Sequence, residues 1–259
     1  MKRIPSLRSP TCGAVDTCAG LWPKTKLTTP GWSIYLVPIA LALLSASEAS
    51  AHGVSDDDKS FIQGNPGISI GPYIYLGAKH MVTGYDHLLF LFGVIFFLYR
   101  LKDVGKYVTL FAVGHSTTLL LGVLANIHAS AYLVDAIIGL SVVYKALDNL
   151  GGLRKILGFV PDQKMAVLVF GFFHGFGLAT KIQDMSISPD GLLANLVSFN
   201  VGVEIGQFLA LSLILILMTL WRRTPAFQRQ VVVANAGLMC AGFILIGYQL
   251  SGFFIRQAT

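Results

Sequence analysis

Two histidines and an aspartate lie within eight residues of each other in the segment KHMVTGYDHLLF. His80 and His87 are seven residues apart, about two helical turns, so both would project from one helix face, with Thr83 and Gly84 between them. Asp86 could accept the second N–H of an imidazole or bind a cation directly. The segment is otherwise apolar enough to enter a bilayer, where an ionisable residue costs about 2.5 to 3.5 kcal/mol and therefore indicates a site or a pathway.

Further polar residues interrupt the apolar segments that follow. They are His115 in GHSTTL, Asp135 near the outer end of its segment, His174 in FGFFHGFGLA, and Asn200, Glu204 and Gln207, which recur at i, i+4 and i+7 on one helix face. Gly171 and Gly175 form a GxxxG pair beside His174 that permits close helix approach.

Any one of these groups could simply form hydrogen bonds between helices, and for His115 and Asp135 that interpretation stays open. The remaining set is harder to explain in that way, because several costly groups at similar depth offset their desolvation only by meeting each other, a metal or water. We therefore predict a metal site formed by His80, Asp86, His87, His115, His174 and Glu204, supported by Asn200, Gln207 and Asp135.

The donor types narrow the choice of ion. Imidazole and carboxylate without thiolate suit nickel, cobalt or zinc, whereas copper(I) favours Met or Cys and magnesium favours oxygen. Cys12, Cys18 and Cys240 offer no disulfide framework and no thiolate cluster, because two of them lie in a segment expected to be removed.

The composition indicates an integral membrane protein. Of the 259 residues, 54% are hydrophobic and only 12% are charged, against about 25% charged in a soluble domain. The net charge of +6 does not indicate nucleic-acid binding, because the Lys and Arg residues lie in short stretches between apolar runs. They are expected to set the topology in a lipid bilayer.

The chain divides into a predicted signal peptide over 1–51, an external segment over 52–72 and a membrane domain over 73–259. The signal has a basic start, the apolar run SIYLVPIALALL and small residues before a cleavage point after Ala51. The fold class we expect is an all-α polytopic membrane protein with six spans, at about 73–99, 107–127, 130–149, 164–182, 195–221 and 231–254.

The charges predict the orientation of this domain. An exported N-terminus makes the first helix run inward, and the loops then expected in the cytoplasm hold Arg100, Lys102, Lys106, Arg154, Lys155, Lys164, Arg222, Arg223 and Arg229. This agrees with the positive-inside bias. We therefore expect a bacterial inner-membrane protein whose mature N-terminus and C-terminus both face the periplasm.

The mature N-terminus could be a second metal site. Cleavage after Ala51 would give His52 an α-amine and an imidazole that can chelate one ion, with Asp56, Asp57 and Asp58 adding negative charge nearby. An ordinary acidic tail after a cleavage site is the alternative.

The pattern His80, five residues, Asp86, His87 resembles the HX5DH motif of the HupE/UreJ permeases, and Phe173-His174-Gly175 resembles the start of their FHGXAVE motif. The resemblance runs from about His52 to the C-terminus. It implies a secondary transporter of nickel or cobalt, with the motif histidines and carboxylates taking part in uptake. Where the family motif ends in Glu this chain has Ala179, so Glu204 is the candidate to supply the missing carboxylate.

Two other classes of protein stay open. Several histidines, an aspartate and Ser116 could also hold a fixed zinc in an intramembrane hydrolase of the alkaline-ceramidase type. A metal-binding accessory subunit, with a membrane-protein partner or as a homo-oligomer, is the third interpretation. The favoured hypothesis is a permease and not an enzyme, in which the ion passes from His80 and Asp86 to His87, His174 and Glu204, then leaves past His115.

Overall fold

The computed structural model describes residues 60, 67–183 and 190–258, and within them the chain is helical without a strand. Its helices are α3 (Ile70–Thr83), α4 (Tyr85–Ile95), α5 (Leu101–Leu124), α6 (Ala131–Asn149), α7 (Gly152–Leu157), α8 (Gln163–Gln183), α9 (Leu192–Arg222) and α10 (Phe227–Ala258). The all-helical fold is therefore confirmed. The predicted signal peptide and His52 lie outside the described residues.

Four of the described helices are long and apolar enough to cross a membrane, namely Lys102–Leu124, Gln163–Gln183, Leu192–Arg222 and Phe227–Gln257. The helix expected over 130–149 is present as α6, but it carries Asp135, Lys145 and Asp148 and is not among these four. Lys102 and Lys106, expected in a loop, lie inside α5, because that helix begins earlier than its apolar core.

The prediction of one continuous helix over 73–99 was wrong, because the segment is broken at Gly84. This residue has φ −71° and ψ 94°, outside the helical region, so α3 ends before it and α4 begins after it. A Cβ atom here would lie 2.9 Å from Nδ1 of His87 and 3.2 Å from Oδ1 of Asp86. Glycine thus leaves room for both side chains at the break, which apolar composition alone does not reveal.

Glycines allow three pairs of helices to approach closely: α3 with α9, α5 with α8, and α6 with α10. A Cβ atom on Gly77 or Gly175 would lie 2.0 Å from a backbone oxygen of the facing helix, and one on Gly171 would lie 2.6 Å from such an oxygen. The close approach predicted from Gly171 and Gly175 is confirmed. Small residues at such contacts are typical of membrane helices, whose backbones must pack without a hydrophobic driving force.

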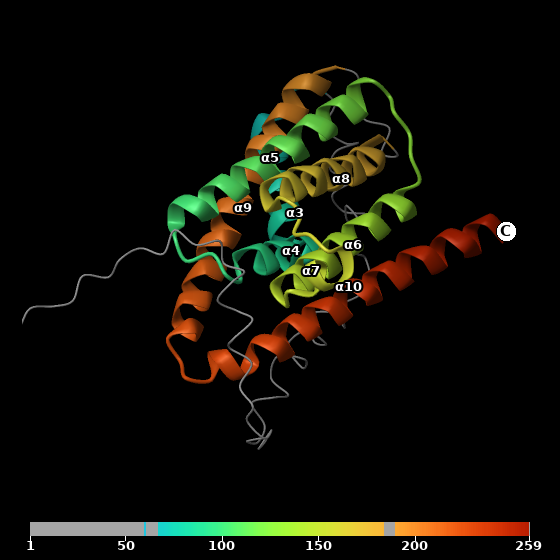
Figure 1. Cartoon of the computed structure of the whole chain (residues 1–259). Coiled ribbons are helices and arrows are strands. Elements are labelled where there is room, and N and C mark those ends of the chain that lie inside the picture. Colours follow the sequence, from blue (N-terminus) through green and yellow to red (C-terminus); the bar gives the residue numbers. More distant parts are fainter. Residues whose placement is uncertain (1–59, 61–66, 184–189, 259) are drawn as a thin grey trace, which may run out of the picture.

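The short helices α3 and α4 lie inside the bundle, with α9 on one side and α6 on the other, whereas α10 runs along the outside of α6 (Figure 1). Arg222 at the end of α9 closes the C-terminal end of α4. Its guanidinium donates to the carbonyl oxygens of Phe96 at 2.9 Å and Leu98 at 3.0 Å, and also to that of Ile95. These contacts satisfy carbonyls that the end of a helix leaves without partners.

Candidate metal-binding site

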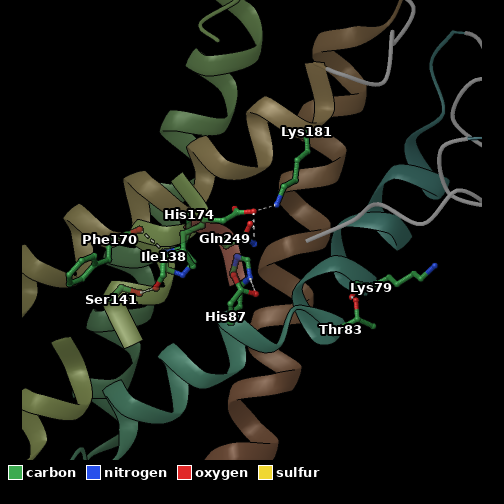
Figure 2. A network of polar contacts seen from close by, with 11 residues as sticks. Lys79, Thr83, His87, Ile138, Ser141, Phe170, His174, Lys181 and Gln249 are labelled. Atoms are coloured by element: carbon green, nitrogen blue, oxygen red, sulfur yellow. Dashed lines mark hydrogen bonds and ion pairs between the residues drawn. The ribbon is translucent and has the colours of Figure 1, made fainter. Parts of the chain in front are cut away.

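Three histidines from three other helices gather around His87 of α4. The centroid of its ring lies 5.2 Å from that of His80 on α3, 6.0 Å from that of His115 on α5 and 5.0 Å from that of His174 on α8. Figure 2 shows His87 and His174 on neighbouring helices of the bundle interior. We call these four residues the histidine cluster. The sequence placed His80 and His87 in one apolar segment and His115 and His174 in two others, and the fold brings all four together.

Asp86 orients the imidazole at the centre of the cluster. Its Oδ1 lies 3.1 Å from Nδ1 of His87, and both side chains are only 1% exposed. Because an ionised carboxylate can only accept, the contact favours the tautomer with its proton on Nδ1. The lone pair is then on Nε2, where a metal ion could bind, in the carboxylate–histidine arrangement that raises ligand basicity.

A backbone carbonyl fixes His174 in the same way. Nδ1 of His174 lies 2.7 Å from the carbonyl oxygen of Phe170, one turn earlier on α8, so Nδ1 is the donor and Nε2 keeps the lone pair. His115 is fully buried, and neither of its ring nitrogens has a hydrogen bond to the described residues. The interior therefore contains imidazole nitrogens whose lone pairs can bind a metal ion.

Phenylalanine rings enclose the cluster. Phe111 lies 4.9 Å and Phe90 lies 5.3 Å from His174, between ring centroids, and Phe199 lies 6.0 Å from His80. Phe90 and Phe111 are each 1% exposed. Apolar walls raise the free energy of an unpaired charge, so they favour neutral imidazoles and strengthen the attraction of any cation to Asp86.

The donors are near one another but do not already surround one point. In the described part of the chain, no group of three or more His, Cys, Asp or Glu side chains is arranged so that it could hold a metal ion. An ion bound between the imidazoles would therefore require side-chain rotation.

Asp135 forms an ion pair that the sequence analysis did not predict. Its Oδ2 lies 2.8 Å from Nζ of Lys181 on α8 and accepts a hydrogen bond from Nε2 of Gln249 on α10 at 3.3 Å (Figure 2). The three side chains tie α6, α8 and α10 together, which agrees with the interhelical interpretation left open for Asp135. A lysine near the end of an apolar segment was the signal that could have revealed the pair.

The polar stripe predicted on α9 is only partly directed inward. Asn200 is 7% and Gln207 is 1% exposed, whereas Glu204 is exposed. The structure thus does not bring Glu204 to the histidine cluster, because its position is rotated away from the buried face of the helix. Thr83, expected on the same face as the histidines, is also exposed, and its hydroxyl donates to the carbonyl of Lys79 at 2.8 Å (Figure 2).

A family model described as HupE / UreJ protein matches residues 56–257, most of the chain. The protein therefore belongs to the HupE/UreJ family, which is associated with nickel and cobalt transport. No curated protein and no solved structure matches it.

At Ala179 the chain lacks the glutamate that ends the family's FHGXAVE motif. Ala179, where the motif would end in Glu, is fully buried on α8 at the contact with Gly122 of α5. A Cβ atom on Gly122 would lie 2.6 Å from that of Ala179, so the position is part of a close helix contact. A small side chain here lets α5 and α8 approach, and it places no carboxylate beside His174.

Proposed function

We propose that this protein is a secondary permease for a divalent transition metal, nickel or cobalt first and zinc as the third candidate. It acts in the bacterial inner membrane, with both ends of the mature chain facing the periplasm. One observation carries the proposal: three imidazoles from three helices lie around that of His87 in an apolar interior, and a carboxylate contacts this central ring. Membership of a family associated with nickel and cobalt transport supports it.

The broken helix is a second support. Transporter sites near the bilayer midplane are typically formed by discontinuous helices, whose ends bring backbone dipoles and polar groups to the substrate. Here the break at Gly84 lies between His80 and His87, so the two motif histidines come from different helices. An ion would enter at His80 and Asp86 and pass to His87, His115 and His174.

Energetics allow such a site to work without ATP. An inside-negative potential favours entry by about 2.3 kcal/mol per charge per 100 mV, which is roughly 4.6 kcal/mol for a dication. Imidazole nitrogens bind nickel and cobalt well, but a transport site must also release them. Donors that require rotation before they converge, as in the histidine cluster, lower the affinity of the resting state.

The test is uptake of labelled nickel, cobalt and zinc by cells with matched amounts of wild-type protein, His87→Ala or His128→Ala. His128 is the matched control, because it lies in an exposed loop and its Nδ1 is 3.0 Å from the carbonyl oxygen of Asn126. We expect His87→Ala to lower uptake of the transported ion by at least about 100-fold. We expect His128→Ala to transport like the wild type.

Two results would contradict the proposal. Absence of uptake of all three ions by the wild type would remove the permease function. Equal uptake by wild type and His87→Ala would show transport that does not depend on the histidine cluster.

A further inference from the structure

A second buried polar group lies where α6 ends and α8 begins. Nζ of Lys145 is 2.5 Å from Oδ2 of Asp148, and the two side chains are only 8% and 7% exposed. The amide of Gln163 on α8 donates to the same Oδ2 at 3.0 Å. We call Lys145, Asp148 and Gln163 the Asp148 cluster. No part of the proposed metal site uses it.

This cluster borders a small cavity of about 10 Å³, close to the space that one water molecule needs. Its polar lining includes Tyr107 and Tyr144 besides the three residues of the cluster. The Tyr107 hydroxyl lies 3.5 Å from Oε1 of Gln163, and the buried Tyr144 hydroxyl has no hydrogen bond to the described residues. Oxygen donors thus face a space that can hold a single small guest.

Two phenylalanines connect the cavity to the histidine cluster. Phe90 and Phe170 line it on the apolar side, and both also contact His174. The ring of Phe90 lies 5.3 Å from the imidazole of His174, and the carbonyl of Phe170 is the acceptor for its Nδ1. One layer of aromatic side chains therefore separates the imidazoles from the Asp148 cluster.

We infer that Asp148 is a second cation-binding position, nearer the cytoplasm than the histidine cluster. This inference rests on the permease function proposed above. A divalent metal ion that leaves the histidine cluster displaces the Lys145 ammonium from Asp148. The positive-inside bias supports this orientation, since Arg154 and Lys155 of α7 lie between Asp148 and Gln163 in the chain. An ion that reaches Asp148 has crossed the aromatic layer. The oxygens of Gln163, Tyr107 and Tyr144 complete the donor set.

The exchange depends on charge and on the other donors. At equal distance a dication attracts a carboxylate with twice the Coulomb energy of an ammonium group. It can take the place of Lys145 at Asp148 if the ammonium moves away and the oxygens of Gln163, Tyr107 and Tyr144 replace part of the ion's hydration water. Oxygen donors hold nickel and cobalt less tightly than imidazole, which suits a position from which the ion must leave. After release Lys145 returns to Asp148, so the buried carboxylate is never left without a counter-charge.

A variant without either charge of the Lys145–Asp148 pair distinguishes a cation-binding role of Asp148 from a purely structural role. Lys145→Met with Asp148→Asn in one chain removes both charges and keeps similar side-chain volumes. If the pair only stabilised the fold, this double variant would transport like the wild type, since replacing a buried ion pair by neutral groups is often harmless. If Asp148 binds the ion, the double variant loses uptake, because no carboxylate remains.

The exposed pair of Lys106 and Asp103 supplies a matched control. It has the same spacing of three residues, an Nζ to Oδ1 distance of 3.5 Å and side chains 62% and 40% exposed. The full-length wild type, each double variant and His87→Ala would be placed in vesicles and given labelled nickel and cobalt. Binding of cobalt to the same purified proteins would be measured by equilibrium dialysis.

We expect the Lys145→Met, Asp148→Asn chain to bind cobalt within about twofold of the wild type and to lower uptake at least about tenfold. The Lys106→Met, Asp103→Asn chain should match the wild type in both. Wild-type uptake in the first double variant, while His87→Ala abolishes it, would overturn the inference and leave the permease function standing. A wild type without uptake would overturn both.

Discussion

The histidine cluster and the Asp148 cluster offset the cost of burying polar groups in different ways. Both bury polar groups in an apolar interior, where uncompensated charge is expensive. The histidine cluster relies on imidazoles that can stay neutral, together with one carboxylate, whereas Asp148 lies against the ammonium of Lys145 at 2.5 Å. Neutral imidazoles can exchange a ligand without leaving a bare charge, whereas Asp148 would become an unpaired carboxylate if Lys145 left without another cation taking its place.

The larger effect is expected when the carboxylate is removed from the histidine cluster. Asp86→Asn keeps the size of the side chain but gives His87 an amide in place of an ionised acceptor. We expect cobalt affinity to fall by about 10- to 100-fold, as is usual when a group that orients a metal-binding histidine is lost. Equilibrium dialysis of the purified variant measures this change.

Asp103→Asn is the control for that substitution, because Asp103 lies in the first turn of α5 and its side chain is 40% exposed. If Asp86→Asn kept wild-type affinity, the contact with His87 would have no part in binding. The contrast between a neutral cluster and a charge-paired one would then no longer hold.

A smaller effect is expected from the helix contact that supports both clusters. Helices α5 and α8 carry His115 and His174 in one cluster and Tyr107 and Gln163 beside the other. A Cβ atom on Gly175 would lie 2.0 Å from the carbonyl oxygen of His115, so Gly175→Ala forces the two helices apart. We expect it to lower the free energy of unfolding by about 1 to 3 kcal/mol and to reduce uptake several-fold.

Gly247→Ala on α10 is the matched control, since a Cβ atom there would meet nothing within 4 Å. That variant should unfold at the wild-type temperature or above it, because alanine favours a helix over glycine by about 0.5 to 1 kcal/mol. Thermal unfolding in detergent measures both. Equal melting temperatures for Gly175→Ala and the wild type would show that the contact tolerates a methyl group.

The smallest effect is expected at Glu204. Its exposed position on α9 separates it from the buried donors, so Glu204→Gln should change uptake by less than about twofold, as substitutions away from packed or functional groups do. The uptake assay used for His87→Ala measures it at matched expression. A loss as large as that of His87→Ala would show that Glu204 belongs to the metal site.

Local spacing in the sequence determined much of the site. The segment from His80 to His87 predicted two histidines that lie together and an aspartate that contacts one of them, and both contacts are present. Gly171 and Gly175 predicted the close approach of α8 to its neighbour. The two histidines do not share a helix face as predicted, because the helix breaks at Gly84, but residues a few positions apart stay close across a single turn as they do on a helix.

The sequence also determined the class of protein, because long apolar stretches with few charges can satisfy their backbone in lipid only as helices. Three features follow from tertiary packing alone: the break of the first helix at Gly84, the contact of Asp135 with Lys181, and the cavity beside Asp148 that Phe90 and Phe170 also line. The tertiary structure also decided that Glu204 is exposed while Gln207 is buried. Such outcomes depend on how each helix is rotated against its neighbours, and side-chain packing between distant segments sets that rotation.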